Sequence, residues 1–144
     1  MPSSLEATVE RCHQALGEIV RGNAEPWAEL FSSENEVSLG NPFGPFALGL
    51  DDVMSAARGA AERYRDGELT GFDRVATYEA ADLACVVEVE RFRARVGEST
   101  DLSPVSLRVT SLFRLERGEW RLVHRHADPI TAPRPAGSVL GSAE

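Results

Sequence analysis

The sequence contains no lysine: all 15 of its basic residues are arginine. Without an ε-amine the chain cannot form a Schiff base, use lysine as a general base, or build a lysine-containing phosphate loop. The 23 acidic residues give a formal net charge of -8. Binding to a phosphate backbone requires a basic surface. We therefore expect no nucleic-acid partner.

Cysteine and long apolar runs are also scarce. The two cysteines, Cys12 and Cys85, lie far apart in the sequence and fit neither a disulfide framework nor a zinc-site spacing. We expect both to act as small apolar core residues. No run approaches the roughly 18 apolar residues of a membrane span, and the first residues do not resemble a signal peptide. These absences predict a soluble, cytoplasmic protein with no membrane partner.

The length and composition fit one globular domain. The chain has 144 residues, of which 42% are hydrophobic and 26% are charged. We expect a single domain over residues 1–128. Residues 129–144 are rich in proline, glycine, alanine and serine, a composition that predicts a flexible C-terminal tail.

Three helices are expected in the first half of the chain. Apolar residues recur at helical spacing over 5–20, and Ser3 with Glu6 fits a capping box at the start of that helix, which should end near Gly22. A short second helix is expected around Trp27, and a third is expected to begin near residue 51, with Gly67 just beyond its last turn.

Strands are expected before and after the third helix. A short strand over 36–39 is followed by a loop over 40–46, which holds two prolines and two glycines. From residue 68 the pattern alternates, which predicts an antiparallel meander with strands at 68–79, 82–95, 104–116 and 119–128. The fold class is therefore α+β, with helices on one side of a curved antiparallel sheet.

Apolar residues occur on both faces of the long strands, which indicates that both faces are covered. Helices would cover one face. The other would most simply bind a second copy of the chain, giving a homodimer through the sheet. The alternative is that the outer valines favour strand structure on a partly exposed surface.

Four segments carry a resemblance to a known family: WAELFS at 27–32, VSLGNPFGP at 37–45, RVT at 108–110 and GEWRLVHRHAD at 118–128. Together they resemble the SnoaL-like branch of the nuclear transport factor 2-like, or ketosteroid isomerase-like, superfamily. The resemblance implies a cone of curved antiparallel sheet wrapped by three N-terminal helices, a pocket between sheet and helices, and a dimer. The superfamily includes isomerases, cyclases and dehydratases, so the fold alone does not select a reaction.

Ketosteroid isomerase chemistry itself is not expected. By the resemblance, Asn41 stands where those enzymes carry a catalytic aspartate, and an amide cannot act as a base. Thr110 stands at the position of their acidic hydrogen-bond donor, and the first helix has no tyrosine.

The same resemblance suggests which strand residues face the pocket. We predict a catalytic set of His124, His126, Arg108 and Glu88, with the histidines as acid or base and Arg108 stabilising an enolate oxygen. The expected ligand-binding residues are Trp27, Asn41, Phe43, Phe46, Glu90, Thr110 and Trp120.

Structural roles for these residues are the alternative. The two histidines could bond sheet edges or helix ends, and Glu88 could form a buried ion pair with Arg108. The aromatic residues could be core. His124, His126 and Asp128 alternate on one strand face and could hold a metal. Without a further convergent ligand from elsewhere in the fold, we expect no metal. His13 is expected on a helix flank without a role.

Two functions therefore remain open. One is binding of a small, largely apolar ligand with acid–base isomerisation, cyclisation or dehydration and no cofactor. The other is a non-catalytic ligand-binding or dimerisation module.

Overall fold

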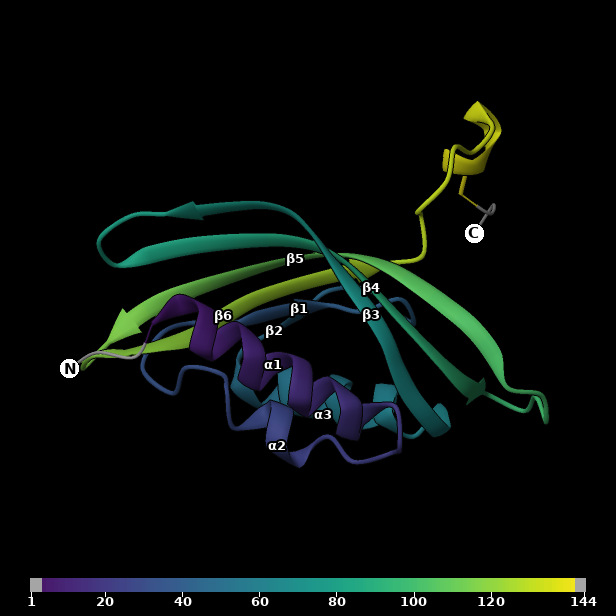
Figure 1. The fold of residues 1–144 in the computed structure, drawn as a ribbon, viewed down its shortest axis with the longest axis horizontal. Helices are drawn as coiled ribbons and strands as arrows, with labels where there is room; N and C mark the ends of the chain where they lie inside the picture. The colour runs from purple at the N-terminus through teal and green to yellow at the C-terminus, as the bar shows by residue number, and fades with distance from the viewer. Residues whose placement is uncertain (1–3, 142–144) are drawn as a thin grey trace.

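A computed structural model describes residues 4–141 of the chain (Figure 1). Three helices and a six-stranded sheet make up the fold. The helices are α1 (Leu5–Ile19), α2 (Glu25–Ala28) and α3 (Leu50–Ala61), and a 3-10 turn, η1 (Ala136–Val139), lies near the C-terminus. The strands are β1 (Ser38–Gly40), β2 (Ala47–Leu48), β3 (Tyr64–Glu79), β4 (Leu83–Val96), β5 (Ser103–Glu116) and β6 (Glu119–Asp128). The predicted α+β class is confirmed.

The helix ends follow from local chemistry. The Ser4 hydroxyl caps α1 by accepting a hydrogen bond of 3.0 Å from the Ala7 amide. The predicted cap, Ser3, lies outside the described residues. Gly22 has a φ of 99°, which ends the α1 turn with a conformation that glycine adopts easily.

The sheet has the strand order β2-β1-β6-β5-β4-β3. The four long strands form the predicted antiparallel meander, and β5 and β6 meet at a tight turn in which Arg117 and Gly118 both have positive φ. The sequence did not indicate that β1 pairs with β6 in parallel, nor that β2 pairs with β1. Both β1 and β2 are too short to show a period.

The sequence predicted that Gly67 lies just beyond the last turn of the third helix, but Gly67 lies within β3. The helix ends six residues earlier, at Ala61. A Cβ at Gly67 would stand 2.6 Å from the Val20 Cβ. Glycine is therefore needed here because β3 passes directly against the end of α1.

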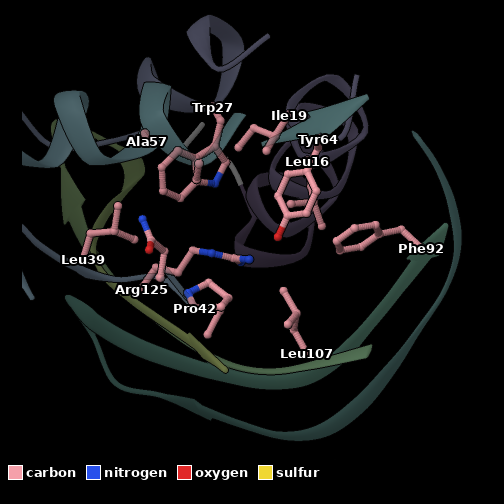
Figure 2. Close-up of a pocket in the computed structure, with 13 residues that line it drawn as sticks. Leu16, Ile19, Trp27, Leu39, Pro42, Ala57, Tyr64, Phe92, Leu107 and Arg125 are labelled. Carbon is pink, nitrogen blue, oxygen red and sulfur yellow. The ribbon is translucent and has the colours of Figure 1, made fainter. Parts of the chain in front are cut away.

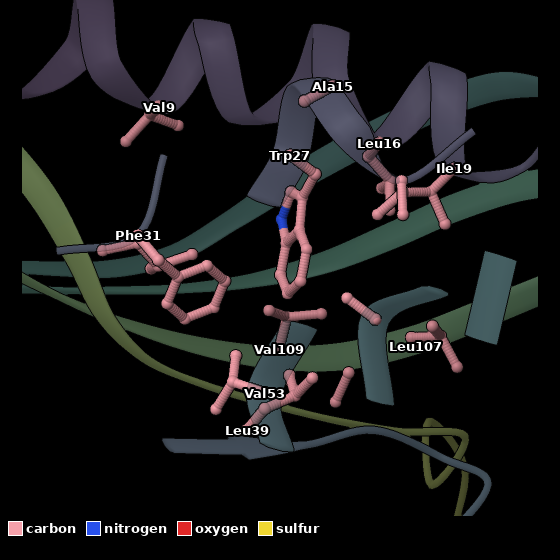
Figure 3. Close-up of a cluster of buried hydrophobic side chains, with 14 of the residues drawn as sticks. Val9, Ala15, Leu16, Ile19, Trp27, Phe31, Leu39, Val53, Leu107 and Val109 are labelled. Carbon is pink, nitrogen blue, oxygen red and sulfur yellow. The ribbon is translucent and has the colours of Figure 1, made fainter. Parts of the chain in front are cut away.

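The helices cover one face of the curved sheet, and the core lies between the two layers (Figures 1 and 3). Buried side chains from α1, α2 and α3 meet inward-facing side chains of the strands. The cluster in Figure 3 includes Val9, Leu16, Ile19, Trp27, Phe31, Leu39, Val53, Leu107 and Val109. Within residues 4–141, no helix combines the length and apolar character that crossing a membrane requires.

A β-bulge in β6 determines which side chains face the helices. Leu122 pairs with Phe113 and His124 pairs with Leu112, so Val123 has no partner on β5. One extra residue reverses the alternation of every residue that follows it. As a result Leu122 faces the helices, His124 faces away, and Arg125 faces the helices again.

Residues 129–141 are exposed and leave the end of β6 without packing on the domain (Figure 1). The chain beyond the sheet thus extends outward instead of lying over the surface.

Candidate functional site

A cavity of about 40 Å³ lies between the helices and the helix-covered face of the sheet (Figure 2). Most of its lining is apolar, and its polar side-chain groups come from four residues: Trp27, Asn41, Tyr64 and Arg125. The other lining residues are Leu16, Ile19, Leu39, Pro42, Ala57, Ala60, Phe92, Leu107 and Ala127. An apolar cavity with a few convergent polar groups is typical of a small-molecule site.

Arg125 is the charged residue of this lining, and it pairs with Glu90. Its two terminal nitrogens donate hydrogen bonds of 2.8 Å to the two carboxylate oxygens of Glu90. The two side chains are only 11% and 4% exposed. Burial by itself disfavours the charged guanidinium, but the Glu90 carboxylate outweighs it and raises the pKa of Arg125. The arginine therefore stays protonated and the pair is neutral overall.

Tyr64 supplies a second hydrogen-bond donor to the cavity. It lies at the start of β3, and its hydroxyl points toward the guanidinium of Arg125 (Figure 2). Burial raises the pKa of Tyr64 to about 12, so the hydroxyl keeps its proton at neutral pH.

Trp27 and Asn41 complete the walls beside Arg125. The Arg125 guanidinium carbon lies 5.7 Å from the centre of the Trp27 ring, a cation–π arrangement. The Asn41 amide is occupied by the protein: its oxygen accepts from the Phe43 amide at 2.9 Å, and its nitrogen donates to the Ala56 carbonyl at 3.3 Å. Asn41 thus fixes the loop that closes one side of the cavity.

The prediction that His124, His126, Arg108 and Thr110 face the cavity is wrong. All four lie on the opposite, outer face of the sheet because of the bulge at Val123 and the alternation of β5. Arg108 Nε donates a hydrogen bond of 2.7 Å to the Asp128 carboxylate. The two histidines also contact outer groups: the Ser38 hydroxyl is 2.7 Å from His124 Nδ1, and His126 Nε2 is 3.5 Å from an Asp128 carboxylate oxygen. Thr110 pairs with His126 across the two strands.

Glu88 faces the helices, as predicted, but it does not line the cavity or pair with Arg108. His13 Nε2 lies 2.8 Å from one of its oxygens, and Arg74 donates to the other at 3.2 Å. The His13 ring also stacks on Phe72 at 3.6 Å between centres. Burial tends to raise the pKa of Glu88, but these partners outweigh it and lower that pKa. His13, expected to have no role, therefore joins α1 to the sheet.

The four predicted aromatic positions separate in the structure. Trp27 lines the cavity, and Phe43 packs on Tyr64 behind it. Phe46 is 68% exposed and lies beyond the edge of β1, near the outer histidines. Trp120 is buried near the start of α1, away from the cavity. Only the first of these contacts the cavity, so the loop 40–46 does not place both of its aromatic residues over one site.

Sequence reasoning missed two polar residues of the cavity, Arg125 and Tyr64, as well as its nine apolar lining residues other than Trp27. The bulge that turns Arg125 inward has no local signal in the sequence. Its partner carried an indirect signal: the inward-facing Glu90 needs a cation, and in a chain without lysine that cation must be an arginine or a histidine. Tyr64 fell between the predicted third helix and the first long strand, so no face was assigned to it.

Metal chemistry has no obvious location in the part of the chain that the structure describes. Among residues 4–141, no three histidine, cysteine or acidic side chains converge as a metal site requires.

Comparisons with solved structures give the same fold. A ketosteroid isomerase-like protein from Erwinia carotovora atroseptica has a TM-score of 0.74 at 16% identity, over 89% of this chain and 95% of that chain. A nuclear transport factor 2 (NTF2-like) superfamily protein from Salmonella enterica serovar Typhimurium has a TM-score of 0.73 at 16% identity, covering 94% and 93%. A provisionally named dehydratase of the NTF2-like family from Streptomyces avermitilis has a TM-score of 0.67 at 19% identity, covering 90% and 100%.

A search of the curated proteins found no match. The family model of the SnoaL-like domain, by contrast, matches residues 5–132. That range includes all three helices and all six strands, so the match covers the whole fold around the cavity. The chain therefore belongs to the SnoaL-like family, whose fold relatives lie in the NTF2-like superfamily.

Proposed function

We propose that the protein binds a small, largely apolar molecule in the cavity between helices and sheet. The observation that carries this proposal is the cavity lining. Apolar side chains form most of it, and the polar ends of Arg125 and Tyr64 point toward each other at one side (Figure 2). An empty apolar cavity lowers the stability of the fold, and so does a buried arginine in its wall. Ligand binding would account for the presence of both features. A molecule with one polar group fits this division of the lining.

The cavity sets a limit on size. Its volume is about 40 Å³, and one water needs roughly 10–15 Å³. A few water molecules or a very small molecule therefore fill it as it stands. A ring-sized ligand would require an outward movement of a wall, and the wall formed by Asn41 and Pro42 belongs to a loop and not to the sheet.

Acid–base catalysis without a cofactor is the second candidate for the same cavity. The observation that favours it is Glu90, a carboxylate held directly behind the cavity wall by Arg125. Tyr64 would donate a proton or a hydrogen bond, since its pKa of about 12 keeps it protonated. Among the described lining residues there is no carboxylate or imidazole, so binding is the function that we propose first.

A cavity-filling variant tests the binding proposal. Ala57 lies in the lining and is 2% exposed, so Ala57→Leu should occupy the space. Titration with acetone, followed by amide NMR shifts, should move signals of cavity residues in the natural chain and not in Ala57→Leu. Ala7→Leu is the matched control, because Ala7 is exposed on α1. Equal shifts in both variants, or none at the cavity in the natural chain, would contradict the proposal.

We also propose a homodimer through the outer face of the sheet. Half-buried apolar side chains of adjacent strands, among them Val87, Val89 and Leu112, lie on that face. A second copy would cover them. Sedimentation at micromolar concentration should give twice the 15.7 kDa mass, and Leu112→Glu should halve it while Ala7→Glu does not. A natural chain that sediments as a monomer would end this proposal.

A further inference from the structure

We infer that the cavity selects an uncharged ligand that presents a single acceptor oxygen, such as a ketone or aldehyde, and rejects the carboxylate of the same size. Arg125 and Tyr64 would donate to that oxygen, and Glu90 would exclude the anion. This inference rests on the proposed binding function and adds to it the chemical class of the ligand.

The first step concerns donors. Arg125 uses its two terminal nitrogens to bind Glu90, which leaves Nε–H and the second hydrogens of the terminal groups without a protein acceptor among residues 4–141. The Tyr64 hydroxyl likewise has no hydrogen-bond partner within that range. Every fully buried side-chain nitrogen or oxygen of the described residues is bonded. The unpartnered atoms of the lining, Arg125 Nε, the Tyr64 hydroxyl oxygen and Trp27 Nε1, therefore keep some accessible surface. The side chains of Arg125 and Tyr64 point toward one another in the cavity (Figure 2).

The second step concerns acceptors. Both hydrogen-bonding ends of the Asn41 amide are occupied by Phe43 and Ala56. Cys12, near the same ion pair, remains a neutral thiol because burial raises its pKa to about 12. Apart from the Tyr64 hydroxyl oxygen, which can accept as well as donate, the free side-chain groups of the cavity are donors, and this suits a ligand oxygen that accepts and does not donate.

The third step concerns charge. Arg125 is the charged residue of the cavity lining, and the bidentate Glu90 carboxylate balances its charge. A ligand carboxylate would bring a second negative charge next to Glu90. Apolar surroundings screen the repulsion between the two carboxylates only weakly. A neutral carbonyl oxygen accepts from the same donors without that penalty. The charge of the accepted ligand is thus set by Glu90, although Glu90 does not line the cavity.

Three small probes of similar size separate these steps in the natural chain: acetone, isobutene and acetate. The ketone should bind at least about tenfold more tightly than the alkene, as expected for hydrogen bonds from a charged donor. The carboxylate should not bind. Equal affinity for ketone and alkene would overturn this inference while leaving the binding function in place, and no binding by any probe would overturn both.

Glu90→Gln tests the role of the carboxylate. The glutamine keeps the size of the side chain and leaves the charge of Arg125 unbalanced, so acetate should now bind and raise the melting temperature of the variant. The natural chain should show no such rise. A variant that folds and still shows no gain from the carboxylate would contradict the inference.

Tyr64→Phe tests the second donor and does not depend on the stability of the ion pair. Loss of the hydroxyl should weaken acetone binding about three- to tenfold and leave isobutene binding unchanged. Tyr78→Phe is the matched control, because Tyr78 is 64% exposed on the same strand. An equal loss for both probes would mean that Tyr64 only shapes the cavity, and would overturn its role as a donor.

Discussion

Glu90 on β4 and Arg125 on β6 bond to each other across the intervening strand β5, through two hydrogen bonds of 2.8 Å. Both side chains lie under the helices and are nearly inaccessible to solvent. A pair of this kind costs desolvation energy, so its members depend on each other more than they stabilise the fold. The ion pair is therefore a sensitive place to test how the cavity is built.

Removing one member of this pair should destabilise the protein much more than removing both. Arg125→Met leaves the Glu90 carboxylate buried and unpaired, and we expect it to lower the free energy of unfolding by about 3–5 kcal/mol. Arg125→Met combined with Glu90→Leu should recover most of that loss. Urea unfolding measures all three chains.

The exposed pair of Arg108 and Asp128 provides the control. The Arg108 side chain is 55% exposed, so Arg108→Met should cost no more than about 1 kcal/mol. If Arg125→Met costs as little, the buried pair does not behave as its geometry requires.

Close packing of β3 on α1 predicts a second difference, between two glycines of one strand. Gly67→Ala should destabilise the protein by about 1–3 kcal/mol, because the new Cβ would collide with the Cβ of Val20 and its carbonyl oxygen. Gly71→Ala meets no atom within 4 Å and should be neutral or stabilising by up to about 1 kcal/mol. Thermal unfolding of the two variants should separate them, and equal melting temperatures would show that β3 can move away from α1.

The Glu88 carboxylate should contribute to acid sensitivity. Its pKa is lowered in the folded protein, since His13 and Arg74 outweigh the effect of burial. The stabilisation is thus present above the unfolded pKa near 4.5 and is lost as the pH falls through the lower, folded value. Urea unfolding at several pH values should show a steeper loss below about pH 4.5 for the natural chain than for Glu88→Gln.

Glu36→Gln is the control for that experiment, because Glu36 is exposed and forms no ion pair among the described residues. Its stability profile should follow that of the natural chain. A Glu88→Gln profile that also follows the natural one would contradict the expected role of this carboxylate.

His124 should titrate at a lower pH than an exposed histidine. Burial is the larger cause of its lowered pKa, the neighbouring His126 adds to it, and the hydrogen bond with Ser38 opposes both. The folded state therefore takes up the proton less readily than the unfolded chain, and the stability contributed by neutral His124 is present above about pH 6.5 and lost as the pH falls below it.

NMR titration of the imidazole signals tests both causes. His126→Gln should raise the pKa of His124 only in part, because burial remains. Full return to the value of an exposed histidine would show that charge repulsion, and not burial, is the dominant cause.

Much of the fold could be predicted from the sequence because its elements are long and periodic. The four meander strands agree with the structure to within one residue, except where β3 begins four residues earlier, at Tyr64. The helix around Trp27 and the turn at Arg117 and Gly118 also follow from local patterns. Such signals involve only neighbours in the sequence, and this is why they can be read from one chain.

The site was harder to predict because it depends on one unpaired residue. Strict alternation puts Trp120, Leu122 and His124 on one face, but the bulge at Val123 separates them. Trp27 and Asn41 do line the cavity, whereas Glu90 faces the helices but lies behind the lining, bonded to Arg125. The partners of Glu88 depended on the packing of α1 across β3, which the sequence pattern does not specify.

The bulge at Val123 also means that β6 divides its later residues between two independent tasks. Arg125 and Ala127 belong to the cavity, whereas His124 and His126 belong to the outer surface. Substitutions can therefore accumulate on one side of this strand without altering the other. Deletion of Val123, in contrast, would exchange the two sides at once, so the length of β6 is under stronger constraint than the identity of its outer residues.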